Sequence, residues 1–210
     1  MQTSSKENTS DENTNISSKN PSDININKDP PQSPEQKPIE KTKLSQKYAF
    51  WFRISEEILK NKIPKQNLDS SEYESQVKKI AEFDTIEDFW AIFQHLRKPD
   101  SCRPGIEFQL FRYGVKPIWE DDNNKNGGKV TIKLRKDFTT IIWEEMIFAF
   151  IGNVLPEIIN GIIVSIKPKF NILHIWFNNY NQENNKIIED TIRDLLQIPP
   201  EVKLEFKKFN

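Results

Sequence analysis

The residues with the clearest chemical potential are Trp119 and Glu120, which stand together in a polar segment that runs from residue 116 to residue 128. A large aromatic ring in such a segment has no periodic apolar neighbours with which to form a core. Beside a carboxylate, the ring could stack on a flat ligand while the acid accepts hydrogen bonds from the ligand's edge. Packing of Trp119 within the protein is the alternative, and the local sequence leaves both interpretations open.

Residues that could perform catalysis or hold a metal ion are poorly represented. His95 and His174 have no nucleophile at a motif spacing, and we expect the first to be solvated or capping and the second to be packed. The single cysteine, Cys102, excludes an internal disulfide and a cysteine-rich zinc site. The run 121–124 lacks the spacing and the distal glutamate of a calcium loop, so we interpret it as a solvated hairpin tip. With no phosphate-binding or dinucleotide motif either, we predict a protein that is not an enzyme and needs no cofactor.

Charge and hydropathy along the 210 residues limit where the protein acts. The formal net charge is -1, so no global positive field attracts nucleic acid, and local lysines must hold any anion. No apolar stretch reaches the roughly 20 residues that span a bilayer, and the first residues form no signal-peptide core. We therefore expect a soluble cytoplasmic protein without a membrane contact. Residues 1–44 are polar and lack aromatic side chains, which predicts a disordered tail ahead of one domain at 45–210.

The predicted domain mixes segments of period 2 with segments of period 3.6. The first kind predicts strands at 48–54, 76–83, 106–111, 130–135, 162–167, 172–177 and 202–206. The second kind predicts three helices, which begin near residues 85, 138 and 184. Asp84 or Thr85 is expected to cap the first helix, which Pro99 stops, and Asp137 to cap the second, which Gly152 ends.

The arrangement of these elements predicts a fold class. Asn126, Gly127 and Gly128 are expected to supply the positive-φ positions of a turn that returns the chain from the strand at 106–111 to the strand at 130–135. Antiparallel strands interrupted by three amphipathic helices predict an α+β fold with the helices on one face of the sheet. The other face would then be open to water or to a ligand.

Four short motifs occur in order between residue 48 and the C-terminus: Phe-Asp-Thr-Ile-Glu-Asp-Phe-Trp at 83–90, Pro-Ile-Trp-Glu-Asp at 117–121, Asn-Lys-Asn-Gly-Gly at 124–128 and Ile-Pro-Pro at 198–200. Together they resemble the translation initiation factor 4E family, whose members bind the 7-methylguanosine cap of messenger RNA. The resemblance implies a curved antiparallel sheet of about eight strands, with three helices on its convex face and a cap-binding concave face. Tyr48 and Tyr73 stand where the commonest members have tryptophan, which resembles the class II branch, the 4E-homologous proteins.

The resemblance implies roles for the aromatic residues and the acid. The methylated base would stack between Trp119 and Tyr73, and Trp176 would touch the N7 methyl group. The alternatives are an ordinary loop position for Tyr73 and simple packing in the sheet for Trp176. Methylation at N7 makes guanine cationic, and a cation is attracted to electron-rich ring faces. Glu120 would accept hydrogen bonds from the guanine N1–H and N2–H groups, which adenine cannot offer as a pair.

The resemblance also implies contacts to the cap's triphosphate. Lys167 matches the family's phosphate-binding arginine, and Lys129 and Lys169 are expected to help it. Lysine holds phosphate as a point charge without the bidentate fork of arginine, so the contact would be weaker. Ile172 stands where the main class has another lysine, as in class II.

A second site is implied on the convex face, where family members receive an amphipathic helix with a Tyr-x4-Leu-hydrophobic motif. The helix belongs to an initiation scaffold protein or to a binding protein. The receiving residues match Ile86, Trp90 and Phe148, with Glu145 near the peptide, and core packing of Trp90 is the alternative. Thr42-Lys43 replaces a His-Pro pair at the edge of this site, so the choice of partner could differ.

Two functions remain open at this point. The first is a cap-binding protein that acts in translation initiation or its regulation. The second is a class II-type repressor, or an interaction scaffold with weak cap affinity, for which the smaller Tyr73 ring and Ile172 are the motivation.

Overall fold

The structure is a computed structural model that describes residues 40–54 and 70–209. Most of the predicted tail, residues 1–39, lies outside the described residues. The last two tail residues, Lys43 and Leu44, are the first two residues of strand β1. The segment 55–69, between that strand and the next element, also lies outside the described residues.

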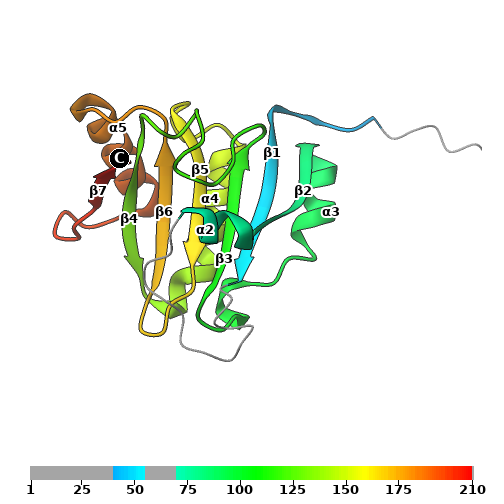
Figure 1. Ribbon diagram of the computed structural model, residues 1–210, viewed down its shortest axis with the longest axis horizontal. Coiled ribbons are helices and arrows are strands. Elements are labelled where there is room, and N and C mark those ends of the chain that lie inside the picture. Colours follow the sequence, from blue (N-terminus) through cyan, green and yellow to red (C-terminus); the bar gives the residue numbers. More distant parts are fainter. Residues whose placement is uncertain (1–39, 55–69, 210) are drawn as a thin grey trace, which may run out of the picture. The chain divides into compact units, whose positions relative to one another are not determined.

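The described residues form one antiparallel sheet of seven strands, in the order β2-β1-β3-β5-β6-β4-β7 (Figure 1). The predicted α+β class is confirmed, with a strand count close to the predicted eight. The strands are β1 (Lys43–Ile54), β2 (Val77–Thr85), β3 (Ile106–Arg112), β4 (Gly128–Leu134), β5 (Ile159–Ser165), β6 (Asn171–Phe177) and β7 (Glu205–Lys208).

Three helices cover one face of the sheet, and a short fourth helix lies on the other. The three are α3 (Ile86–Phe93), α4 (Thr139–Ile151) and α5 (Gln182–Leu196), and the short one is α2 (Ser70–Gln76). In Figure 1, α4 lies behind the strands and α2 in front of them. We call the face with α2 the front face. The sequence pattern predicts no helix at 70–76, and Gln76, expected to begin the strand at 76–83, is instead the last residue of α2. A short helix of polar residues has no apolar stripe by which to recognise it.

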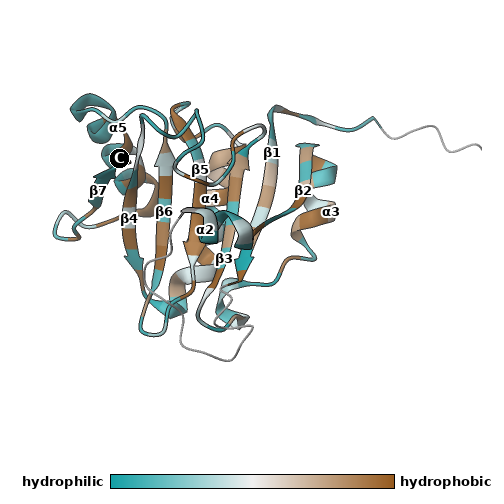
Figure 2. Cartoon of the chain, in the orientation of Figure 1, coloured by the Kyte–Doolittle hydropathy of each residue, from teal (hydrophilic) through white to brown (hydrophobic). Residues whose placement is uncertain are grey.

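The main core lies between the sheet and the three covering helices. Alternate strand residues such as Phe50, Leu110, Ile162 and Ile175 point into it and meet Ile147 of α4. In Figure 2, β4 and β5 are largely hydrophobic, whereas α5 is hydrophilic over much of its length, as expected for a helix with only one buried face.

One prediction about strand pairing is wrong. The strands β3 and β4 do not form a hairpin, because β3 pairs with β1 and β5, and β4 pairs with β6 and β7. Local alternation identifies a strand but not its partner, since pairing depends on segments far away in the sequence. The loop between β3 and β4 therefore crosses the end of β5 rather than making a tight turn.

The prediction for the two glycines is also wrong, because neither Gly127 nor Gly128 has a positive φ. The structure requires glycine there for space. A Cβ on Gly127 would collide with the carbonyl oxygen of Phe177, and one on Gly128 would collide with the ring of Tyr180. Close approach of neighbouring backbones is the other common reason for glycine.

The helix ends follow the predicted chemistry in part. Thr85 caps α3, since its hydroxyl oxygen accepts a 3.1 Å hydrogen bond from the amide of Asp88. The helix ends at Phe93, well before Pro99. Asp137 is not a cap, because it lies inside the 3-10 turn η2 (Lys136–Phe138) that leads into α4, whereas Gly152 does end that helix.

Candidate functional site

Trp119 lies at the surface of the long loop between β3 and β4. Its side chain is 41% exposed, so the indole is not part of the hydrophobic interior. The neighbouring Glu120 is exposed too, and its carboxylate makes no hydrogen bond or ion pair with any residue in the described part of the chain. An aromatic face and a free acid are therefore presented together.

A buried asparagine holds this loop in place. Asn124 is fully buried, and its side-chain amide donates hydrogen bonds of 2.9 Å to the carbonyl of Lys116 and 2.8 Å to the carbonyl of Ile118. Its oxygen accepts a 2.9 Å bond from Asn160 of β5, whose amide also donates to the carbonyl of Asn123. The prediction of a solvated tip is wrong for Asn124, because sequence does not reveal which polar side chain of a loop turns inward.

The acidic part of the loop serves the backbone rather than a metal ion. Asp121 accepts hydrogen bonds from the backbone amides of Lys116, at 3.2 Å, and of Asn123, at 2.9 Å. Within 40–54 and 70–209, no group of histidine, cysteine or acidic side chains is arranged to hold a metal ion. Nor does any helix there have the length and apolar character needed to cross a membrane.

Tyr73 lies on α2 and is anchored to the front face of the sheet. Its hydroxyl donates to Glu107 Oε2 at 3.3 Å and accepts from Gln109 Nε2 at 2.9 Å. The guanidinium of Arg53 lies 5.0 Å from the centre of the ring. Burial, and then the charge of Glu107, raise the pKa of Tyr73 well above its usual value, so the hydroxyl keeps its proton.

Glu107 is the centre of a buried polar network on β3. Arg53 of β1 donates to it twice, from Nε to Oε2 at 3.0 Å and from Nη2 to Oε1 at 2.9 Å. Ser165 of β5 donates to Oε1 at 2.9 Å. Burial opposes ionisation, but the hydrogen bonds and charge of Arg53, together with the charge of Lys167, outweigh it and hold the pKa of Glu107 at about 2.

The predicted phosphate-binding lysines lie near this network. The ammonium of Lys167 is 3.7 Å from Glu107 Oε1 and remains partly exposed. Lys129 of β4 lies opposite Lys207 of β7 in the sheet register. Burial lowers the pKa of Lys129, and the neighbouring charges of Lys207 and Lys167 lower it further. These three like charges share a small region, which favours an anion, whereas Lys169 is solvent-exposed just beyond β5.

Trp176 of β6 is paired with Lys129 of β4 in the sheet register, so the two side chains lie on the same face of the sheet. It is 6% exposed and packs against Phe209, with ring centres 4.5 Å apart, and edge-on against Phe111, at 5.7 Å. His174, two residues earlier, is 3.1 Å from the hydroxyl of Thr131. Burial and the charge of Lys129 lower its pKa to about 3, so it is a neutral packed residue, as predicted.

The helix-covered face carries a cluster of exposed aromatic residues. Trp90 of α3 is 48% exposed, and its ring centre lies 5.8 Å from that of Phe148 on α4. Phe93 packs against the rings of both Trp90 and Phe148. Ile86 is exposed one turn before Trp90 on α3. Core packing therefore does not account for Trp90, and the structure brings Ile86, Trp90 and Phe148 to the same surface.

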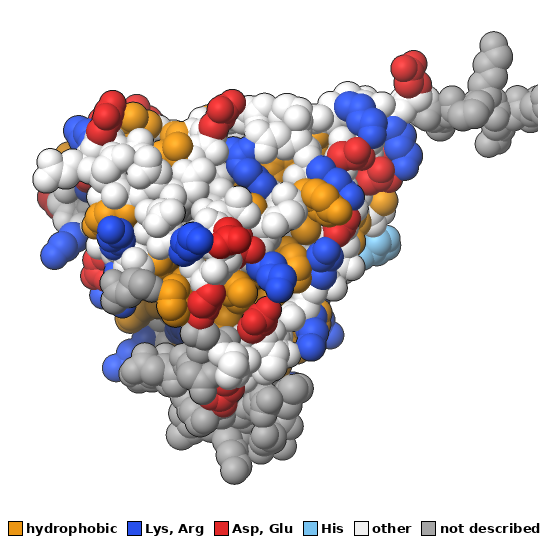
Figure 3. Space-filling model, turned by 45° about the horizontal axis from the view of Figure 1, so that its top comes forward, with side chains coloured by type: hydrophobic (Ala, Val, Ile, Leu, Met, Phe, Trp, Pro, Cys, Tyr) orange, Lys and Arg blue, Asp and Glu red, His pale blue; other side chains and the backbone are white. Residues whose placement is uncertain are grey.

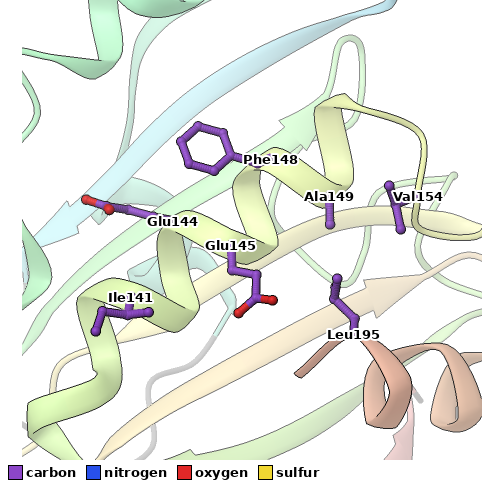
Figure 4. A pocket seen from close by; sticks show the side chains of 7 residues that line it. All are labelled: Ile141, Glu144, Glu145, Phe148, Ala149, Val154 and Leu195. Atoms are coloured by element: carbon purple, nitrogen blue, oxygen red, sulfur yellow. The ribbon is translucent and has the colours of Figure 1, made fainter. Parts of the chain in front are cut away.

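A groove of about 550 Å³ continues from this cluster along α4. Figure 4 shows Glu145 and Ala149 on the side of α4 that faces Leu195 of α5, while Phe148 projects from another side. The groove is mainly apolar with an acidic rim. Elsewhere, Figure 3 shows acidic and basic side chains interspersed over one face of the molecule, in keeping with the net charge of -1.

A comparison with protein-family models matches residues 43–210 to eukaryotic initiation factor 4E. The chain belongs to the eukaryotic initiation factor 4E family. Among curated proteins, it is 33% identical over 150 residues to eukaryotic translation initiation factor 4E-4 of Caenorhabditis elegans, covering 69% of this chain and 70% of that protein. It is also 33% identical over 141 residues to eukaryotic translation initiation factor NCBP of Triticum aestivum, covering 66% of this chain and 61% of that protein.

Among solved structures, the chain is similar to Caenorhabditis elegans eIF4E-3 in a complex with the 4E-binding protein Mextli and a cap analog. The TM-score is 0.69 at 25% identity, and the match covers 80% of this chain and 93% of that one. The family resemblance read from the motifs is thus confirmed. Because the 4E family consists of non-catalytic translation initiation factors, the prediction that the protein is not an enzyme is supported as well.

The predicted 4E-family residues fall into three groups in the structure. Trp119 and Glu120 share one braced loop, Tyr73 and Lys167 share the carboxylate of Glu107, and the predicted partner residues share the helix-covered face. The sequence patterns do not single out the buried Asn124 and Glu107. The one available signal for Glu107 is a charged residue between the apolar Ile106 and Phe108 of a predicted strand.

Proposed function

We propose that this 4E-family protein binds the 7-methylguanosine cap of messenger RNA and acts in translation initiation or its regulation. The observation that carries the proposal is the exposed Trp119 beside Glu120, which has no polar partner among the described residues, on a loop that Asn124 and Asn160 hold in place. An exposed indole held on a rigid support is prepared for a flat partner, because little further ordering is needed on binding. The similar eIF4E-3 structure contains a cap analog.

In this proposal the base stacks on Trp119, with Tyr73 as the second wall. Stacking of a base on an aromatic ring contributes about 1–3 kcal/mol, and the positive charge of the methylated guanine adds attraction to both rings. Glu120 accepts hydrogen bonds from the N1–H and N2–H groups, which selects guanine over adenine. Trp176 is 6% exposed and packs against Phe209 and Phe111, so packing in the sheet accounts for it better than a contact with the N7 methyl group.

The triphosphate is proposed to lie over the lysine-rich part of the front face. Lys129 supplies positive charge from β4, and Lys167 and Lys169 supply it from the loop between β5 and β6. Burial is the main cause of the lowered pKa of Lys129, and the charges of Lys207 and Lys167 lower it further, so a bound phosphate chain would relieve the repulsion among these three lysines.

The helix-covered face is proposed to receive an amphipathic helix with a Tyr-x4-Leu-hydrophobic motif from a scaffold or binding protein. Trp90, Ile86 and Phe148 supply the apolar contact, and Glu145 lies beside it. Exposed aromatic residues that cluster on a helix pair are the usual anchors of such binding. The 4E-binding protein Mextli was solved together with the similar eIF4E-3.

We further propose the class II branch for this protein, supported by Tyr48 and Tyr73. Tyr48 is fully buried, and its hydroxyl donates a 3.1 Å hydrogen bond to the carbonyl of Phe150. This hydrogen bond satisfies the buried hydroxyl and so favours tyrosine at position 48. A repressor or scaffold role with weak cap affinity is the second candidate, favoured by Ile172, which adds no charge at the phosphate site.

A calorimetric titration tests the proposal. The full chain is titrated with 7-methylguanosine triphosphate and with unmethylated guanosine triphosphate, and we expect a clear preference for the methylated nucleotide. Trp119→Ala should weaken its binding by roughly 5- to 150-fold, the loss of one stacking contact of about 1–3 kcal/mol. Phe138→Ala, which removes an exposed aromatic ring outside both sites, is the matched control. Equal affinity for both nucleotides would favour the scaffold role, and an unaffected Trp119→Ala variant would refute the stacking scheme.

A further inference from the structure

The front face carries a buried carboxylate whose two oxygens serve different parts of the site. Glu107 Oε2 accepts from Arg53 Nε and from the Tyr73 hydroxyl, at 3.0 and 3.3 Å. Glu107 Oε1 accepts from Arg53 Nη2 and from Ser165, both at 2.9 Å, and lies 3.7 Å from the ammonium of Lys167. Glu107 itself is 6% exposed, so every one of these contacts is shielded from solvent on the carboxylate side.

The position of helix α2, which carries Tyr73, depends on polar contacts to Arg53 and Glu107. The short helix α2 ends at Gln76, whose side-chain oxygen accepts a 2.9 Å hydrogen bond from Arg53 Nη1. Three residues earlier, Tyr73 contacts Glu107 through its hydroxyl and Arg53 through its ring. A helix of seven residues is not stable by itself, so contacts of this kind determine where it lies.

The hydroxyl of Tyr73 is constrained in both of its hydrogen-bonding roles. It donates to Glu107 and accepts from Gln109, which is fully buried on the same strand. A donor and an acceptor fixed by one β-strand define both the position of the oxygen and the direction of its proton. These two contacts from β3 therefore constrain the orientation of the ring.

We infer that Glu107 is a positioning residue, which holds the Tyr73 ring through its hydroxyl at the orientation required to stack on a flat cationic base. This inference rests on the proposed function, because it assigns to Tyr73 the second wall of the base site. Glu107 does not touch the ligand. It acts through Tyr73, with Gln109 as the second contact to the same hydroxyl and Arg53 as the group that keeps the carboxylate in place.

A double-mutant cycle in the full chain tests this inference. The ligand is 7-methylguanosine as the nucleoside, since a ligand without phosphate is insensitive to the effect that loss of Glu107 has on Lys167. Tyr73→Phe keeps the stacking ring and removes only the hydroxyl, and we expect binding about fivefold weaker, the equivalent of about 1 kcal/mol. Glu107→Gln should weaken binding to a similar degree, and adding Tyr73→Phe to it should change the affinity by less than about twofold.

A purely structural role would instead give two losses that multiply in the double variant, which would overturn the inference. Tyr113→Phe, the same substitution at an exposed tyrosine, is the matched control. Circular dichroism checks folding, and where Glu107→Gln does not fold, Gln109→Leu replaces it in the cycle as the other contact to the hydroxyl. Wild-type protein that fails to bind the nucleoside or its triphosphate refutes the proposed function as a whole. Wild-type protein that binds, with Tyr73→Phe at the same affinity, refutes the positioning role alone.

Discussion

Replacement of Asn124 by alanine is the most direct test of how the Trp119 loop is held. The side chain of Asn124 is fully buried and makes three hydrogen bonds, two donated to the carbonyls of Lys116 and Ile118 and one accepted from Asn160. Alanine removes all three and leaves two carbonyl groups and one amide without these partners. A cavity the size of a carboxamide replaces the network beneath the loop.

The magnitude follows from the number of bonds. A neutral hydrogen bond contributes about 1 kcal/mol net, so Asn124→Ala should lower the free energy of unfolding by about 3 kcal/mol. For a domain of this size, each kcal/mol lowers the melting temperature by roughly 2–4 °C, which predicts a decrease of roughly 6–12 °C. Asn123→Ala is the matched control. Its side chain is exposed and, within the described part of the chain, hydrogen-bonds only to Asp121, so the expected loss is within about 0.5 kcal/mol.

Urea unfolding followed by circular dichroism measures the loss of stability, and titration with 7-methylguanosine triphosphate measures the consequence for binding. We expect Asn124→Ala to bind more weakly than Asn123→Ala, because a loop that opens more often presents Trp119 in the binding position for a smaller fraction of the time. If the two variants have the same stability within about 0.5 kcal/mol, the buried amide does not hold the loop and the reasoning is wrong.

Three further predictions concern stability and partner binding. The pKa of Glu107 is about 2 in the folded protein against 4.5 for the free group, which corresponds to about 3 kcal/mol of folding stability. This contribution is fully present above pH 4.5 and is lost as the pH falls towards 2. Urea unfolding at pH 6, 4 and 3 should show the decline, and constant stability would contradict it. Gly127→Ala should prevent folding or lower the free energy of unfolding by more than about 3 kcal/mol, because its Cβ would collide with the carbonyl of Phe177. Gly114→Ala, in open space at φ 85°, should lower it by only about 1–2 kcal/mol, and thermal unfolding measures both. Trp90→Ala should abolish capture of the full chain by an immobilised Tyr-x4-Leu-hydrophobic peptide, and Phe138→Ala should not; capture of both variants alike would place the peptide elsewhere.

Much of the secondary structure was predictable because it depends on residues close together in the sequence. The alternation at 130–135 identified β4, the apolar stripe after Thr85 identified α3, and the threonine itself was a recognisable cap. Helix α2 was not predictable in this way. It is short and polar, and its position depends on contacts to two strands: from Gln76 to Arg53 of β1, 23 positions away, and from Tyr73 to Gln109 of β3, 36 positions away.

The sequence by itself determined the kinds of elements, the family and the residue types available for a cap site, because motifs and periodicity are properties of neighbouring positions. Only the tertiary structure decided the order of the strands, the burial of Asn124 and the sharing of Glu107 between Tyr73 and Lys167. These features arise from contacts across long separations, such as Glu107 with Ser165, 58 positions later. Whether such a polar group is buried and satisfied depends on how the whole sheet assembles, and no local pattern records that outcome.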